Sequence, residues 1–516
     1  MSDFKKKVGG LLRGEGFSAG AMTALIIAVV IVFNVILYTV VEMFGLYLHK
    51  KDSTDLSLSG STDTLFAEAV EKAKIDGKKV KISFCYKEDE VKEHSTGSFV
   101  YTTAKNFEAR YPDLIELDFI DIIKRKTDSG RGELIEDFDK YKTDMYGNET
   151  MILKNSVIFE YGNNYRVITD TYSTGGFANF FTLDTNGYAT AYNGEEVMAG
   201  VISWVLSSDH KTAYFTQYHG EIADLAFSNL LASAGYFVNV VDLRREEIPE
   251  DADLVVISNP TSDFERSAEG SGVRSEIDRL ADYLDRGGNL FVALDPYVKK
   301  LPVLEGFLSE AGISFASTED KNGKLLKNLV KDPRNAITTD GFTLVTDYAG
   351  TDMAKALGAK VKKYNKDGNV IVSKAAALEI DESRGASALL LSSSASVAEA
   401  GGKTVNERGS YCIAAASERD TDGGKAKIFV ISSIYLAVSD SLITNGYSNR
   451  DFVYALLDEF YGAGKVPYGC KVSLYDTTTL ENLKLGTAKI YTALIMAVPL
   501  LVAVTGAVVI VRRKNR

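Results

Sequence analysis

The sequence predicts an α/β protein whose polar region is attached to a membrane at both ends. Two uncharged apolar segments, Ala19–Val41 and Ile490–Val511, are each long enough to cross a hydrocarbon core of about 30 Å as a helix. Between them, strand-like and helix-like patterns alternate along the chain, as they do in α/β proteins. We therefore expect two transmembrane helices that flank a large α/β region.

Basic residues beside the apolar segments predict the orientation in the membrane. They are Lys5, Lys6, Lys7 and Arg13 before the first segment, and Arg512, Arg513, Lys514 and Arg516 after the second. By the positive-inside rule, both tails stay in the cytoplasm. A cleaved signal peptide is the alternative for the first segment, but that segment is longer than a usual signal-peptide core and no small-residue cleavage site follows it. We expect a two-pass protein of the cell membrane with residues 52–489 outside the cytoplasm.

The composition argues against several classes of partner and cofactor. The net charge of −12 disfavours nucleic acid, which binds to basic surfaces. The cysteines, Cys85, Cys412 and Cys470, are odd in number and widely spaced, so they predict neither a disulfide framework nor a Cys-rich metal site. The four histidines are too scattered to suggest a zinc site. We therefore expect no metal or other cofactor.

The first part of the polar region has the order of elements of a thioredoxin-like domain. Strand, helix, strand, helix, hairpin and helix are expected at Lys79–Cys85, Tyr101–Tyr111, Leu114–Ile122, Arg131–Tyr141, Ser156–Val167 and Glu195–Leu206. Redox chemistry on that fold needs a Cys-x-x-Cys pair at a helix start, and the chain has none. We expect a thioredoxin-like domain without CxxC that serves as a scaffold.

The second part predicts a doubly wound parallel sheet. Its strands are expected at Thr212–Thr216, Phe237–Leu243, Leu254–Ser258 and Leu290–Leu294, and its helices at Ile222–Ala234 and Arg274–Leu284. The strands are nearly continuous apolar runs, which is typical of strands buried on both faces. Gly287 and Gly288 end the second helix.

From Ile313 to Cys470 we expect the α/β pattern to continue, with a partly β insertion at about 335–372. The expected organisation is a cytoplasmic tail (1–18), transmembrane helix 1 (19–46), the thioredoxin-like domain (53–208), a flavodoxin-like α/β domain with the insertion (209–470), a linker (471–489), transmembrane helix 2 (490–511) and a second tail (512–516).

Polar residues follow three strands of the predicted parallel sheet. His219 and Glu221 follow the first strand, Asn259 the third and Asp295 the fourth. Ligands of open α/β sheets bind at the carboxyl ends of strands, so these residues are a candidate site for a cation, a sugar or another polar group. The structural interpretation is favoured, because Glu221 suits a helix start and Asn259 precedes a proline turn.

Two catalytic motifs are excluded by their context. Gly16–Gly20 matches the Gly-x-Ser-x-Gly elbow of hydrolases, but it opens a membrane segment and follows no strand. Gly401–Thr404 resembles the end of a phosphate loop, but Val397 stands where the first glycine is required. Any energy from ATP must therefore come from another subunit.

Several segments, in this order along the chain, carry a family resemblance. They are Asp55–Ala67, Tyr192–Ala199, Tyr214–Glu221, Ile248–Pro260, Asp282–Pro296 and Ser448–Phe452. The chain resembles the Gld-type auxiliary subunit (the gliding-motility-associated G component) of bacterial ABC transport systems over nearly its whole length. Tyr214–Glu221 is similar to a family Tyr-Phe-x-x-Gly-His-Gly-Glu pattern, with Tyr218 in place of the first glycine.

The resemblance implies a membrane-anchored, non-ATPase subunit that works with an ABC ATPase and a multi-span permease. Asn34, the strongly polar residue of the first span, could bond to the chain's own second span or to the permease. An envelope polysaccharide or protein is a further expected ligand. The alternatives are a membrane-anchored envelope enzyme or polar-ligand-binding protein that uses His219, Glu221 and Asp295, and a scaffold that binds only proteins.

Overall fold

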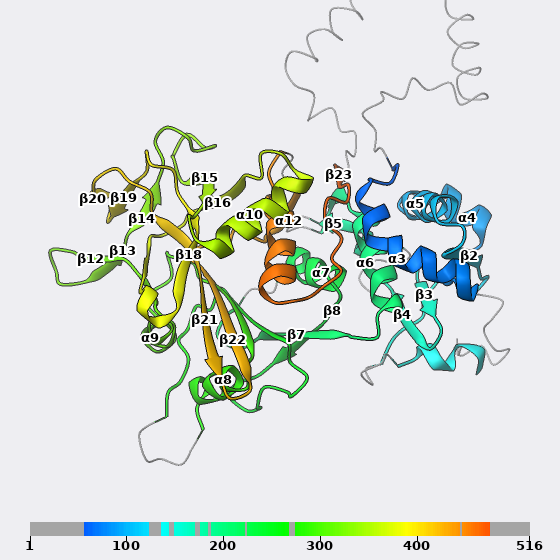
Figure 1. Cartoon of the computed structure of the whole chain (residues 1–516), viewed down its shortest axis with the longest axis horizontal. Helices are drawn as coiled ribbons and strands as arrows, with labels where there is room; N and C mark the ends of the chain where they lie inside the picture. Colours follow the sequence, from blue (N-terminus) through cyan, green and yellow to red (C-terminus); the bar gives the residue numbers. More distant parts are fainter. Residues whose placement is uncertain are drawn as a thin grey trace, which may run out of the picture. The chain divides into compact units, whose positions relative to one another are not determined.

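The computed structural model of the chain describes residues 56–122, 136–143, 149–170, 176–183, 187–221, 224–267, 274–443 and 446–474 (Figure 1). Leu56–Tyr475 form one compact unit. Both predicted membrane segments, their tails and Asn34 lie outside the described residues. Within those residues, none of the helices has the length and apolar character needed to cross a bilayer.

The first sheet contains four strands in the order β2-β1-β3-β4. They are β1 (Val80–Phe84), β2 (Ile115–Phe119), β3 (Val157–Tyr161) and β4 (Asn164–Ile168). β1 pairs with β2 in parallel and with β3 antiparallel, and β3 and β4 form a hairpin. Gly162 has φ +63° in the hairpin turn, a backbone conformation that glycine adopts without strain.

Helices around this sheet close its core. They are α3 (Ser61–Asp76), α4 (Glu88–Glu93), α5 (Gly97–Arg110) and α6 (Gly194–Leu206), and a 3₁₀ turn covers Glu136–Tyr141. α6 is buried over most of its length because it packs on the sheet and also against α7 (Leu225–Ser233) of the next region. The predicted helix Arg131–Tyr141 is described only from residue 136, where it is the 3₁₀ turn.

A small sheet has the strand order β23-β6-β5. Two of its strands precede α6 in the chain, and the third is at the end of the described residues. Its strands are β5 (Phe181–Leu183), β6 (Ala189–Tyr192) and β23 (Ser473–Leu474), and a 3₁₀ turn at Ala178–Phe180 precedes β5. β23 pairs antiparallel with β6, so the last described residues return to the strand that leads into α6.

The main sheet has 11 strands among the described residues, and five of them form a parallel group. The group, in the order β8-β7-β9-β10-β22, consists of β7 (Lys211–Thr216), β8 (Tyr236–Val241), β9 (Leu254–Ser258), β10 (Asn289–Ala293) and β22 (Gly424–Ile431). β7 lies between β8 and β9. The chain therefore adds β8 on one side of β7 and then crosses to the other side, where β9 and the following parallel strands lie. The predicted α/β class with a parallel sheet is confirmed.

Antiparallel strands extend the sheet beyond β22. They are β21 (Cys412–Thr421), β18 (Ala386–Leu391), β15 (Thr343–Tyr348) and β16 (Val370–Ser373), with β17 (Leu378–Ile380) and β11 (Ile313–Phe315) paired beside β21. β15 and β16 come from residues 335–372, where a partly β insertion is expected, and they continue this sheet. Short strands complete the region: β12 (Ser317–Glu319), β13 (Leu325–Lys327), β14 (Leu329–Lys331), β19 (Val397–Ala400) and β20 (Lys403–Asn406).

Helices cover both faces of the main sheet. One face packs on α7 (Leu225–Ser233), α10 (Asp352–Tyr364) and α12 (Asn449–Ala455), which a π-helical turn at Leu456–Phe460 continues. The other face packs on α8 (Glu276–Asp285) and α9 (Pro302–Glu310). Two short helical turns, α11 (Ser439–Ile443) and Glu382–Arg384, lie in loops. Because both faces are covered, the central strands can carry the nearly continuous apolar runs that the sequence shows.

Candidate functional site

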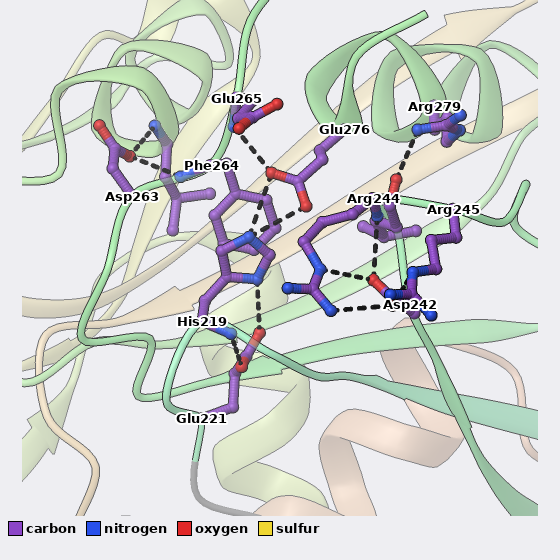
Figure 2. Close-up of polar contacts among 12 residues, drawn as sticks. His219, Glu221, Asp242, Arg244, Arg245, Asp263, Phe264, Glu265, Glu276 and Arg279 are labelled. Carbon is purple, nitrogen blue, oxygen red and sulfur yellow. Dashed lines mark hydrogen bonds and ion pairs between the residues drawn. The ribbon is translucent and has the colours of Figure 1, made fainter.

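His219 lies between two carboxylates at the carboxyl end of β7 (Figure 2). Its Nδ1 is 3.1 Å from Glu221 Oε1, and its Nε2 is 3.0 and 3.1 Å from the two carboxylate oxygens of Glu276. All three side chains are almost fully buried, with exposed fractions of 5% or less. The ring also stacks on Phe264, with centroids 4.1 Å apart. We call His219, Glu221 and Glu276 the His219 triad.

The charges of the triad keep its histidine protonated. Burial alone would lower the pKa of His219, but the hydrogen bonds and charges of Glu221 and Glu276 outweigh burial and raise the pKa to about 9. Burial would raise the pKa of Glu221, but its hydrogen bonds to the His219 side chain and to backbone amides, together with the charge of His219, outweigh burial and lower the pKa. A general base must be able to accept a proton near neutral pH, so a histidine held in this state is unsuited to that role.

The turn that carries His219 uses an unusual backbone. Tyr218 has φ +82° and Gly220 φ +78°, both in the left-handed region. A Cβ at position 220 would lie 2.1 Å from Thr261 Oγ1, so glycine is required there. The backbone amides of Thr261 and Ser262 both donate to the carbonyl of His219. The turn is therefore tied to the loop that follows β9.

Tyr218 is a non-glycine residue at positive φ, and its side chain has a partner. The guanidinium of Arg244 lies over its ring at 4.1 Å. Arg244 is held in turn by the buried Asp242, through Nε at 2.9 Å and Nη2 at 3.0 Å. This cation–π contact offsets part of the strain of a non-glycine residue at positive φ.

Asn259 stands at the carboxyl end of β9, beside a small cavity. The residue is 5% exposed, has φ +55°, and donates its backbone N–H to the carbonyl of Ala293. Its buried Oδ1 has no hydrogen-bond partner among the described residues. The cavity has a volume of about 30 Å³ and is lined mainly by apolar side chains, with Asp224, Ser258 and Asn259 as its polar members. That volume accommodates one or two waters.

Asp295 follows β10 as expected, but it serves another cluster. Its carboxylate accepts the amide of Tyr297 at 2.8 Å. Its charge also acts on Lys374, whose Nζ is 3.3 Å from Tyr435 Oη. No hydrogen bond or ion pair between described residues joins His219 to Asn259 or Asp295. The four predicted residues therefore share an edge of the sheet without forming one constellation.

Two features of the His219 triad were not predicted from the sequence. Glu276, its second carboxylate, is the first residue of α8 and follows the N-cap Ser275. The sequence therefore indicates that Glu276 starts a helix, but not that it contacts His219. Glu221 was expected to open a helix, but α7 begins at Leu225 and Asp224 caps it. Glu221 instead turns back, and its Oε2 accepts the amide of His219 at 2.6 Å.

A second carboxylate cluster joins the two ends of the described unit. Glu195, at the start of α6, accepts the amide and hydroxyl of Ser59, both at 2.7 Å, and the amide of Lys471 at 2.9 Å. Lys471 Nζ also donates to Ser57 Oγ at 2.6 Å. One buried carboxylate thus holds the first and last described segments side by side.

The neighbouring Glu196 links this point to the main-sheet region. It accepts the hydroxyl of Tyr454 and lies 3.5 Å from Arg450 Nε, both on α12. Arg450 also donates to the carbonyl of Cys470 at 2.7 Å. Burial raises the pKa of Glu196, although the charge of Arg450 opposes that shift. We call Glu195, Glu196 and Arg450 the chain-end cluster, which was not predicted from the sequence.

The cysteines and the remaining acidic residues offer no obvious reactive centre. Cys85 and Cys470 are buried and all three cysteines are free. Burial raises the pKa of the Cys85 and Cys412 thiols to about 12, so neither is a thiolate at neutral pH. Across the described ranges, no group of three or more histidine, cysteine or acidic side chains is arranged to hold a metal ion.

Comparisons with known proteins yield distant likenesses. No protein-family model matches the chain, and no curated protein sequence matches it. A solved structure of the mmIFT52 N-terminal domain aligns with 50% of this chain and 99% of its own, at 16% identity and a TM-score of 0.36. PurLQS from Thermotoga maritima aligns with 49% of this chain and 100% of its own, at 10% identity and a TM-score of 0.28. A cytoplasmic protein from Salmonella typhimurium aligns with 43% of this chain and 87% of its own, at 11% identity and a TM-score of 0.24.

Proposed function

We propose that this chain is the membrane-anchored, non-ATPase auxiliary subunit of a bacterial ABC-type transport system. It acts together with a separate ATPase and a multi-span permease. The apolar segments Ala19–Val41 and Ile490–Val511 anchor it, both tails lie in the cytoplasm, and the α/β region between them lies outside. The order of segments that resemble the Gld-type subunit supports the assignment to this class.

The observation that carries the proposal is the chain-end cluster. A unit placed between two membrane spans has its two ends at the same membrane surface. Glu195 holds Ser59 and Lys471 together. Among the described residues that Glu195 contacts, these two lie nearest in the chain to the two membrane segments. Glu196 and Arg450 then join this point to α12 under the main sheet. A movement of the anchors relative to one another would therefore act directly on the contact between the two halves of the unit.

Finer details of the fold belong to the same proposal. We assign the four-stranded sheet to a thioredoxin-like domain without CxxC, because its strand order and its final hairpin and helix agree with that fold. We assign the parallel group of the main sheet to a flavodoxin-like domain, because its order β8-β7-β9-β10-β22 corresponds to 2-1-3-4-5 in that fold. Neither domain needs catalytic activity to work as an auxiliary subunit.

A membrane-anchored envelope enzyme or polar-ligand-binding protein is the alternative. Asn259 favours it, because a buried acceptor without a partner lies near the β7–β9 crossover, where ligands of such sheets bind. Catalysis by His219 is disfavoured by its two carboxylate partners, which hold it as a cation. The alternative therefore reduces to a polar-ligand site at Asn259, without general-base chemistry.

The test is a purification of the tagged full-length chain from its native membrane in a gentle detergent. We expect an ABC ATPase and a multi-span permease to co-purify with it. Replacing Ala19–Val41 with an unrelated apolar span should release the permease without preventing membrane insertion. The matched control replaces Ile490–Val511 in the same way and shows which span makes the contact.

A second comparison separates the proposal from its alternative. Asn259→Ala should leave the complex and transport unchanged if the chain is an auxiliary subunit without a site at that edge. Purification of the intact chain alone, without an ATPase or permease, would contradict the proposed function. Loss of activity in Asn259→Ala with the complex intact would favour the ligand-binding alternative.

A further inference from the structure

A cavity of about 350 Å³ lies where α3 and α6 meet the main-sheet region. Its volume falls in the range of ~300–1,000 Å³ that small-molecule sites occupy. α3 and α6 supply one wall, and the turn at Gly235 and the loop Gly462–Lys465 supply the other. Such junctions between two cores are common locations of ligand sites.

Three glycines with left-handed backbone conformations line the loop side of the cavity. Gly235, Gly462 and Gly464 have φ values of +92°, +73° and +84°. A Cβ added at any of the three would meet no atom within 4 Å. The open space at these positions therefore results from the cavity, and the glycines are needed for their backbone conformation rather than for close packing.

The inner wall is apolar but contains two unsatisfied polar atoms. Leu65, Phe66 and Leu206 line it together with Ser203 and Trp204. Trp204 is 4% exposed, and its ring stacks on His210 at a centroid distance of 4.1 Å. Its Nε1 and the Oγ of Ser203 are buried without a hydrogen-bond partner among the described residues. An indole N–H can only donate, so Trp204 Nε1 is a donor available to a bound acceptor.

Two lysines stand at the rim with weakly held partners. Lys465 Nζ pairs with Glu68 at 2.9 Å, but these side chains are 58% and 84% exposed, and exposed pairs stabilise little. Lys211 Nζ is 3.4 Å from Asp253 and 3.6 Å from Asp209. Asp209 is the acidic residue that lines the cavity, and its side chain is 79% exposed. Lys465 can therefore turn to a ligand at small cost, and the pairs of Lys211 are both 3.4 Å or longer.

From this arrangement we infer that the cavity binds an amphipathic carboxylate, with its apolar chain against Leu65, Phe66 and Leu206 and its carboxylate between Lys211 and Lys465. Two lysines and one aspartate line the cavity, and Trp204 Nε1 is an unpartnered donor, which favours an anion over an alcohol or a cation of the same length. The site goes beyond the transport role and does not depend on it.

The chain carries its own reporter of this cavity, because Trp204 is its single tryptophan. The full-length protein in a non-ionic maltoside detergent is titrated with decanoate, and tryptophan emission is recorded. Decanol and decyltrimethylammonium serve as probes of equal chain length and different head group. We expect a saturable change in emission with decanoate and at least a tenfold weaker response to the other two. An equal response to decanol would overturn the inference, as would the absence of a saturable change with decanoate.

Variants at the rim give matched controls. Lys465→Gln and Lys211→Gln should each raise the Kd for decanoate roughly three- to tenfold, since each removes one charge-assisted contact. Glu68→Gln frees Lys465 and should leave the Kd unchanged or lower it. Ala69→Phe fills the cavity and should abolish the change in emission, with folding checked by circular dichroism. An unaltered Kd in both lysine variants would refute the carboxylate site even if Ala69→Phe failed to fold. Vesicles of an anionic phospholipid, used in place of decanoate, distinguish a free carboxylate from a lipid head group.

Discussion

The two buried carboxylate clusters of this protein differ in what they connect. The His219 triad joins residues of one region, the turns after β7 and β9 and the start of α8. The chain-end cluster joins Ser59, α6, α12 and Lys471, which span nearly the whole described unit. Similar chemistry therefore fixes a loop in one place and closes the unit in the other. The chain-end cluster connects more of the unit, so we expect it to contribute more to the free energy of unfolding than the His219 triad.

The largest effect is expected from breaking the chain-end cluster at Arg450. Arg450→Ala leaves Glu196 buried without its cationic partner and removes the bond to the carbonyl of Cys470. We expect the free energy of unfolding to fall by about 3–5 kcal/mol, measured by urea titration of the full chain. Arg266→Ala is the control, because its pair with Glu310 is exposed and should contribute less than ~1 kcal/mol. Equal effects of the two substitutions would contradict the assigned role of Arg450.

The His219 triad should give a smaller effect that depends on pH. The pKa of His219 is raised from 6.5 to about 9 in the folded protein, so its ion pairs stabilise the fold fully below about pH 6.5. This contribution, roughly 2–3 kcal/mol, should be lost progressively as the pH rises through 9. Urea titrations between pH 6 and 10 would measure it.

His219→Gln provides the contrast for that titration, because it cannot carry the charge. The variant should be less stable than the wild type at pH 6, and the difference should shrink toward pH 10. A difference that is independent of pH would show that His219 is not held as a cation.

Glu195→Gln should loosen the chain ends without breaking the unit. The amide keeps one acceptor oxygen, but the bonds to Ser59 and Lys471 lose their charge. We expect the free energy of unfolding to fall by about 1–2 kcal/mol and hydrogen exchange to become faster at the backbone amides of Ser59 and Lys471. Glu108→Gln is the control, because its carboxylate accepts the backbone amide of Leu117 and so joins α5 to β2, away from both chain ends. Faster exchange confined to one chain end would argue against a shared anchor.

The smallest effect is expected at Tyr218, beside the triad. Tyr218→Gly removes the backbone strain of a non-glycine residue in the left-handed region, which costs ~1–2 kcal/mol. The substitution also loses the contact with Arg244 and makes the unfolded chain more flexible, and each of these effects destabilises the fold by roughly 0.5–1 kcal/mol. The net change in thermal stability should be below ~1 kcal/mol. Tyr218→Val keeps the strain and loses the ring, so it should be clearly less stable than the glycine variant. The reverse order would show that backbone strain is unimportant there.

Much of the main sheet could be predicted from the sequence. The strand expected at Leu254–Ser258 is β9 with the same bounds, and those expected at Thr212–Thr216 and Leu290–Leu294 differ from β7 and β10 by one residue at the ends. Apolar runs bounded by turn residues depend on local properties, so a short window of sequence contains the signal. The edge position of His219 and Asn259 follows from the same pattern, because carboxyl ends of parallel strands share one edge.

The partners of these residues could not be predicted, because they depend on contacts between distant segments. Glu276 is 57 residues from His219, and Lys471 is 276 residues from Glu195. Asp295 was predicted to belong to the same site as His219. It lies at the predicted edge of the sheet, but its carboxylate bonds to the amide of Tyr297 and not to the His219 triad. A position along a strand identifies an edge of the sheet, whereas the direction and burial of each side chain depend on how the helices pack.

The sequence by itself determined the α/β class, the bounds of the central strands and the absence of a Cys-x-x-Cys pair, because each depends on residue types within one short stretch. Only the tertiary structure decided that His219 is a buried cation, that Glu195 joins both chain ends and that Trp204 lines a cavity. These properties arise from charge pairing and packing between segments far apart in the chain, where burial makes each contact strong and no local pattern records it.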